Sequence, residues 1–126
     1  MKPPTRKPTD AELAILRILW TRGPSTVRDV ATEMGREEAY TTVLKLLQIM
    51  TDKQLVRRNE AERTHVYEAA HSEAQMQQHL VADLLDRAFD GSAATLVMRA
   101  LSAKKTSAKD VEEIRRLLKT KRGGSQ

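Results

Sequence analysis

AYTTVLKLLQIMTDKQLVRRNEAERTHVYE, residues 39–68, decides the fold, because it joins an amphipathic helix directly to a charged hairpin. Along a helix that turns about 100° per residue, hydrogen-bonding side chains form one narrow stripe. The stripe consists of Thr41, Lys45, Gln48 and Asp52. The opposite side is aliphatic, with Val43, Leu46, Leu47 and Met50. A polar stripe backed by aliphatic residues favours a helix that lies in a DNA major groove, where polar side chains meet base edges.

The second half of this stretch predicts a two-stranded wing, with residues 55–58 pairing with residues 64–68. Arg57, Arg58 and Arg63 are placed on it so that they would contact DNA phosphates. The alternative interpretation is an ordinary amphipathic helix followed by an exposed hairpin, with no ligand.

Upstream, the segment Thr9-Asp10-Ala11-Glu12 is a capping box that opens a helix over residues 9–22. Its apolar residues recur at helical spacing: Leu13, Leu16, Leu19 and Trp20. Trp20 could be a platform for a ligand, but we expect it in the core. Gly23-Pro24 ends this helix, Ser25 is expected to cap a short helix over residues 26–34, and Gly35 is expected to end that helix in a left-handed conformation. The order of elements predicts a mainly α fold with a small β-wing, a winged helix-turn-helix domain.

Downstream of His71 the sequence predicts three helices and no strand. They begin at the capping residues Ser72, Ser92 and Ser107, and the first of them is expected to stop at Asp90-Gly91. About 50 residues seldom build a core alone, so a dimer of two interlocking copies is expected. The residues expected at the dimer contact are Leu80, Leu84, Leu85, Leu96, Val97, Leu101, Ile114, Leu117 and Leu118. The alternative is that these helices fold back on the winged domain of the same chain.

The expected organisation is therefore a flexible basic arm (1–8), a winged-helix DNA-binding domain (9–70), a helical dimerisation domain (71–119) and a disordered basic tail (120–126). The two ends account for the basic charge. Six charges lie there, on Lys2, Arg6, Lys7, Lys119, Lys121 and Arg122, and removing them from the net charge of +5 leaves −1. Local placement of charge, and not the total, must therefore support DNA binding.

Several classes of protein are disfavoured by composition. With no cysteine there is neither a disulfide nor a thiolate metal site, and no apolar run reaches the roughly 18 residues of a membrane span. His79 and Asp83 lie one helical turn apart and could form half a metal site, but solvated side chains are the simpler interpretation. The chain shows no nucleophile with a positioned base and no glycine-rich phosphate loop. We therefore expect a cytoplasmic protein that is not an enzyme and has no cofactor and no metal.

Together these segments resemble the penicillinase-repressor (BlaI/MecI) family of bacterial transcriptional regulators, along nearly the whole chain. The matching segments are DAELAILRILW (10–20), AYTTVLKLL (39–47), KQLVRR (53–58), THVY (64–67) and the three-helix tail. The resemblance implies a homodimer that binds dyad-symmetric DNA operators and represses antibiotic-resistance or stress genes, often with its own operon. It also implies a set of DNA contacts, which with Gln48 of the polar stripe gives Tyr40, Thr41, Thr42, Lys45, Gln48, Arg58 and Arg63.

The resemblance further implies release by a membrane sensor that is a metalloprotease and cuts the dimerisation domain, at an Asn-Phe pair in well-known members. The corresponding region here is Met98, Arg99 and Ala100, so Arg99-Ala100 replaces that pair and the same cleavage specificity is not expected. Another branch of the family senses copper through C-terminal cysteines, which this chain lacks. Two other functions stay open from the residues alone: a winged helix used for protein contacts, and a ligand-responsive regulator that needs no proteolysis.

Overall fold

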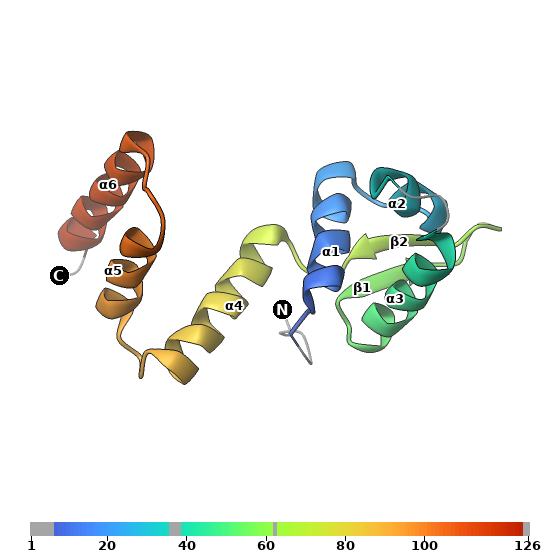
Figure 1. Ribbon diagram of the computed structural model, residues 1–126, viewed down its shortest axis with the longest axis horizontal. Helices are drawn as coiled ribbons and strands as arrows, with labels where there is room; N and C mark the ends of the chain where they lie inside the picture. Colours follow the sequence, from blue (N-terminus) through green and yellow to red (C-terminus); the bar gives the residue numbers. More distant parts are fainter. Residues whose placement is uncertain (1–6, 36–38, 62, 125–126) are drawn as a thin grey trace. The chain divides into compact units, whose positions relative to one another are not determined.

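The computed structural model describes residues 7–35, 39–61 and 63–124, and the expected basic arm and linker therefore lie largely outside it at residues 1–6 and 36–38. The chain divides into two compact units, residues 1–82 and 83–126, with the boundary inside the helix α4 (Glu73–Ala88; Figure 1). The first unit contains three helices and a hairpin, and the second contains two further helices. A mainly helical fold with a small two-stranded sheet is confirmed.

Capping boxes begin the first two helices. In α1 (Asp10–Arg22) the Thr9 hydroxyl accepts from the Glu12 amide while the Glu12 carboxylate accepts from the Thr9 amide, as predicted. In α2 (Val27–Glu33) the N-cap is Thr26, which shares a second box with Asp29. The prediction that Ser25 caps α2 is wrong. Ser25 instead exchanges two backbone hydrogen bonds with Tyr67, of 2.9 and 2.8 Å, and so extends the wing as a third short segment.

The third helix, α3 (Tyr40–Asp52), leads directly into the hairpin of β1 (Val56–Asn59) and β2 (Val66–Ala69). The strands are antiparallel, with Val56 opposite Ala69 and Asn59 opposite Val66. The hairpin was predicted at residues 55–58 and 64–68, so its existence is confirmed while its bounds shift by one or two residues. Leu55 is not part of the strand because its amide bonds back to the Met50 carbonyl at 2.9 Å and closes the turn after α3.

One hydrophobic core lies between the three helices and the hairpin. Its largest buried side chains include Ile15, Leu16, Leu47, Met50, Leu55, Tyr67 and Met76. Trp20 is half-buried against this core and its indole Nε1 donates to the His71 carbonyl at 2.9 Å, so it serves packing, as expected. Met76 comes from the first turn of α4, so this turn packs in the core of the first unit.

The C-terminal helices are α4 (Glu73–Ala88), α5 (Ala93–Ala103) and α6 (Ala108–Gly124). The three predicted serine caps are present, since Ser72, Ser92 and Ser107 each accept from the backbone amide three residues on. Asp90 and Gly91 end α4 with φ of 50° and 80°, and the Gly91 amide bonds to the Leu85 carbonyl. Helix α6 continues to Gly124, through part of the segment that was expected to be disordered.

Candidate nucleic-acid interface

The outer face of α3 is polar and open, and its inner face is buried. Val43, Leu47 and Met50 have no exposed surface, whereas every member of the predicted polar stripe is exposed. The exposed residues are Thr41, Lys45, Gln48 and Asp52. Burial of the aliphatic side against α1, α2 and the hairpin fixes the rotation of the helix, so the stripe faces outward and is held by the core.

No side chain among the described residues caps the start of α3. Its N-cap residue is Ala39, which has no acceptor to offer to the first-turn amides. Thr41 and Thr42 lie in this first turn and are exposed, so their backbone amides could donate to a phosphate oxygen. By contrast, α1 and α2 both begin with complete capping boxes. The alanine at the N-cap of α3 is the signal in the sequence that distinguishes this helix start.

The end of α3 is anchored by a buried ion pair. Lys53, the C-cap residue, places its Nζ 2.7 Å from the Glu12 Oε1 of α1, and the two side chains are only 14% and 2% exposed. Burial raises the pKa of Glu12, but the hydrogen bonds from Lys53 and Thr9 outweigh burial and hold this pKa below its ordinary value. The pair was not predicted, because the partners are 41 residues apart.

The wing carries its cations in three different settings. Arg57 donates to the Ala70 carbonyl at 3.1 Å, so it supports the base of the hairpin. Arg58 places Nη2 3.0 Å from the Glu60 carboxylate, whose Oε1 also lies 3.6 Å from His65 Nε2. Arg63 is exposed near the tip. A phosphate would therefore compete with Glu60 for Arg58. The pairing of Arg58 with Glu60 was not predicted from the sequence.

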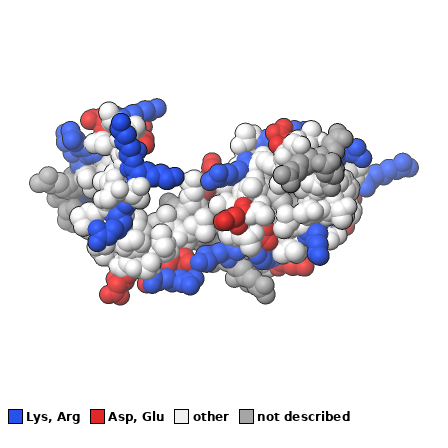
Figure 2. Space-filling view, in the orientation of Figure 1, with Lys and Arg blue, Asp and Glu red and all other residues white. Residues whose placement is uncertain are grey.

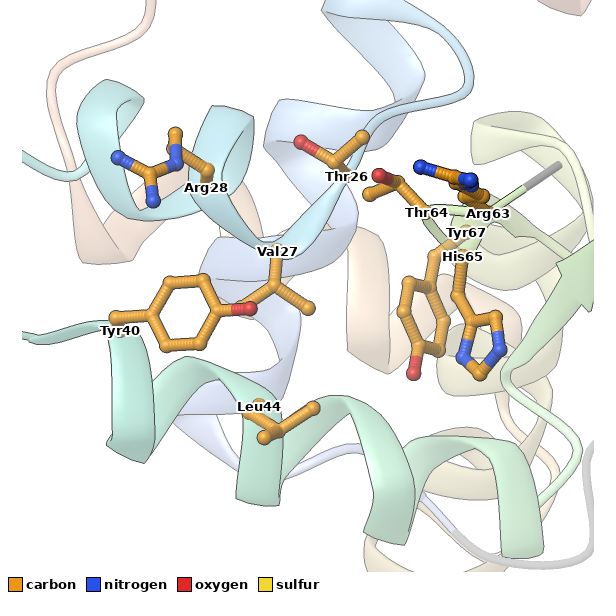
Figure 3. A pocket seen from close by; sticks show the side chains of 9 residues that line it. All are labelled: Thr26, Val27, Arg28, Tyr40, Leu44, Arg63, Thr64, His65 and Tyr67. Carbon is orange, nitrogen blue, oxygen red and sulfur yellow. The ribbon is translucent and has the colours of Figure 1, made fainter. Parts of the chain in front are cut away.

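Tyr40 does not belong to the outward stripe. It lies with Leu44 along the side of α3 that faces a pocket of about 380 Å³ between α2, α3 and the wing. Figure 3 shows its ring extending from the start of α3 toward Val27, with Arg28 on one side and Arg63, Thr64 and His65 on the other. The pocket also brings in Arg28, a residue of α2 that the sequence reading did not single out.

Charged side chains are scattered over the visible surface, with uncharged areas between them. Figure 2 shows Lys and Arg side chains interspersed with Asp and Glu on the face that it presents. The residues that could favour DNA are thus local groups on α3, the wing and the pocket.

The second unit presents apolar side chains to solvent. Among the described residues from Asp83 onward none is buried, and Leu117 and Leu118 are 59% and 62% exposed. Leu84, Val97 and Leu101 are exposed too, while Leu85, Leu96 and Ile114 are half-buried. Leu80, which was expected with them, packs partly against the core of the first unit. Met98, Arg99 and Ala100 are exposed within α5.

Residues 8–120 match the penicillinase repressor family. The chain belongs to this family. The resemblance drawn from the sequence is thereby confirmed, and the family is one of transcriptional regulators and not a class of enzymes.

Two curated relatives are similar over part of their length. They are the proteins named transcriptional regulator BlaI from two strains of Mycobacterium tuberculosis, CDC 1551 (Oshkosh) and ATCC 25618 (H37Rv). Each relative is 38% identical to this chain over 84 residues, which cover 64% of this chain and 61% of the relative. The aligned part thus spans less than two thirds of either relative.

Two further observations concern the described residues. None of their helices combines the length and apolar character that crossing a membrane requires. No group of three or more His, Cys, Asp or Glu side chains among them is arranged to hold a metal ion.

Proposed function

We propose that the protein is a dimeric, DNA-binding transcriptional repressor that acts in the cytoplasm on a dyad-symmetric operator. The observation that carries this proposal is the outward polar stripe of α3, held in place by the buried side chains of Val43, Leu47 and Met50 and flanked by an arginine-bearing wing. Thr41, Lys45 and Gln48 would meet base edges, while Arg58 and Arg63 would contact phosphates. Thr42 and Tyr40 would lie at the two flanks of the helix start.

Dimerisation would give the reader a second half-site and so increase both affinity and the length of DNA that is read. The support is the exposed apolar surface of α5 and α6, which a second copy would cover. In this proposal residues 9–70 read DNA and residues 71–119 form the helical dimerisation domain, with the first turns of α4 seated on the winged core.

Membership of the family supports the remaining parts of the proposal: repression of antibiotic-resistance or stress genes, control of the protein's own operon, and release by a membrane sensor-protease. Residues 98–100 are exposed, yet they lie inside α5. Proteases cut preferentially at exposed, unstructured segments, so cleavage here would require this part of α5 to unwind first.

The test is binding of the purified protein to DNA from upstream of its own gene, against a scrambled duplex at fixed near-physiological salt. We expect a preference of about a thousandfold or more, with a footprint of two related half-sites. Affinity should fall steeply as salt is raised, because counterions return to the phosphates. Weak binding of equal strength to both duplexes, at every upstream region tried, would contradict the proposal and favour a winged helix used for protein contacts.

A further inference from the structure

We propose that the pocket between α2, α3 and the wing holds one sugar–phosphate unit of the operator strand, clamped between Arg28 and Arg63. This inference rests on the proposed function and extends it to residues outside the recognition helix. The pocket has a volume of about 380 Å³ and draws on three separate elements, with Thr26, Val27 and Arg28 from α2 and its cap, Tyr40 and Leu44 from α3, and Arg63, Thr64, His65 and Tyr67 from the wing.

The charge of the lining selects an anion. Two arginines line the pocket, and none of the described residues that line it is acidic. Arg28 lies at the rim beside α2 and Arg63 lies across the pocket on the wing (Figure 3). Both side chains are exposed, so their guanidinium groups can turn toward a phosphate in the pocket while remaining largely hydrated beforehand. Planar guanidinium groups suit phosphate oxygens because they donate two parallel hydrogen bonds.

The shape of the lining selects a phosphate that is attached to something apolar. Val27, Leu44 and Tyr67 line the pocket with carbon, and Figure 3 shows the Tyr40 ring lying above Leu44 with its hydroxyl beside Val27. A bare inorganic anion would leave this surface unused. A deoxyribose ring would pack against it, and the hydroxyl groups of Tyr40 and Thr64 could donate to the sugar or phosphate oxygens.

The position of the pocket beside α3 favours DNA as the source of the sugar–phosphate group. Tyr40 lines the pocket, and Thr41, the next residue, begins the exposed stripe of α3. A backbone unit held here would therefore belong to a strand whose bases lie beside α3. Contacts to α2 on one side and the wing on the other would fix the depth and register of the helix in the groove, without reading sequence themselves.

Arg28→Ala and Arg63→Ala, each alone and combined, test the clamp in the full-length protein, with Arg17→Ala as the control. Arg17 is an exposed arginine of α1 that does not line this pocket, so it carries the same charge change. We expect each pocket variant to lose operator affinity by about tenfold or more, with equal losses on variant operators. The dependence of log affinity on log salt should become shallower by about two for a dimer, which loses one phosphate contact in each half-site.

Operators that carry a single neutral methylphosphonate at successive positions locate the contact. At the clamped position the methylphosphonate should weaken binding by the wild type. The same modification should weaken binding by Arg28→Ala only slightly, because that variant already lacks the contact. The double variant should lose less than the product of the two single losses, since both arginines hold the same group.

The outcomes separate the inference from the function on which it rests. Specific operator binding by the wild type, with Arg28→Ala no weaker than Arg17→Ala, would overturn the clamp and leave the repressor proposal standing. Absence of specific binding by the wild type would overturn both. Titration with deoxyadenosine monophosphate and with inorganic phosphate distinguishes the source. The pocket would instead be a site for a free anion if two results occur together. Either compound would bind saturably at micromolar concentration and lose this binding in Arg28→Ala, and the methylphosphonate operators would bind the wild type as tightly as the unmodified operator.

Discussion

The contact between Glu12 and Lys53 joins two ends that are far apart in the sequence, the first turn of α1 and the residue that closes α3. It therefore fixes where α3 ends relative to the core. Removing one member of a buried ion pair leaves the other charge without compensation, which costs more than the net value of the pair. A solvated pair between α1 and α2, Arg22 with Glu33 at 3.1 Å, provides a natural comparison.

Glu12→Gln should lower the free energy of unfolding by about 2–3 kcal/mol, because it removes the charge of a buried carboxylate that contacts Lys53. The matched variant Glu33→Gln should cost less than about 1 kcal/mol, since exposed ion pairs contribute little. Urea denaturation above neutral pH measures both. Equal small losses in the two variants would show that the Glu12–Lys53 pair does not anchor α3.

Lys45 is the one cation in the stripe of α3, and its exposure allows it to be removed without disturbing the core. If Lys45 donates to a base edge, Lys45→Ala should weaken operator binding by about 1–3 kcal/mol and relax the preference at one position of each half-site. Competition binding against a set of point-variant operators measures both effects, with Lys119→Ala of α6 as the charge-matched control. Unchanged binding by a folded Lys45→Ala protein would remove Lys45 from the reading face.

At the scale of elements, patterns that are local in sequence were predictable. The stripe of α3 follows from spacings of three and four residues, and the serine caps of α4, α5 and α6 depend on a hydrogen bond to the amide three residues on. What could not be predicted depends on tertiary contacts. Ser25 has the chemistry of an N-cap, but pairing with Tyr67 uses its backbone, and Thr26 caps the helix instead. The pocket could not be predicted for the same reason, because Arg28 and Arg63 line one pocket only when α2 and the wing are packed in the folded chain.

The junction between β2 and α4 contains a buried histidine that should make the first unit sensitive to acid. His71 is only 7% exposed, and its ring meets that of His79 edge-on with centroids 6.1 Å apart. Burial lowers the pKa of His71, and the positive charges of His79 and Arg57 lower it further, against a hydrogen bond with the Gln54 backbone that favours the protonated form. The folded protein therefore holds this side chain neutral at pH values where the unfolded chain would protonate it.

Because the pKa of His71 is depressed on folding from 6.5, its contribution to stability is fully present above pH 6.5 and declines as the pH falls toward the folded-state pKa. We expect wild type to lose stability between about pH 7.5 and about pH 5.5 relative to His71→Gln, which removes this titration. Urea denaturation at both pH values measures the difference, and His65→Gln on the exposed wing serves as the control. A stability difference that stays constant with pH would show that His71 does not carry the acid sensitivity.

At the scale of the whole molecule, the two units differ in how far each satisfies its own apolar surface. The first buries Ile15, Leu16, Leu47 and Met50 completely, whereas none of the described residues in the second is buried. A chain of this size gains most of its stability from apolar burial. In the proposed dimer a second copy would cover the exposed leucines of the second unit, and the two copies would present two copies of α3 to the two halves of a dyad-symmetric operator.

If the proposed dimer forms, Leu84→Asp in α4 and Leu117→Asp in α6 should produce monomers, because each would place a charge in the proposed apolar contact. Gln78→Asp adds the same charge to an exposed polar position of α4 and should leave the dimer intact. Sedimentation equilibrium at micromolar protein gives the oligomeric state, and the same samples should bind operator far more weakly, since a monomer loses the effective concentration that the second reading head provides. Dimers that persist in both leucine variants would show that these helices do not form the contact. Wild-type monomers would instead favour packing of the helices against the winged unit of the same chain, and in that case each recognition helix would bind its half-site alone.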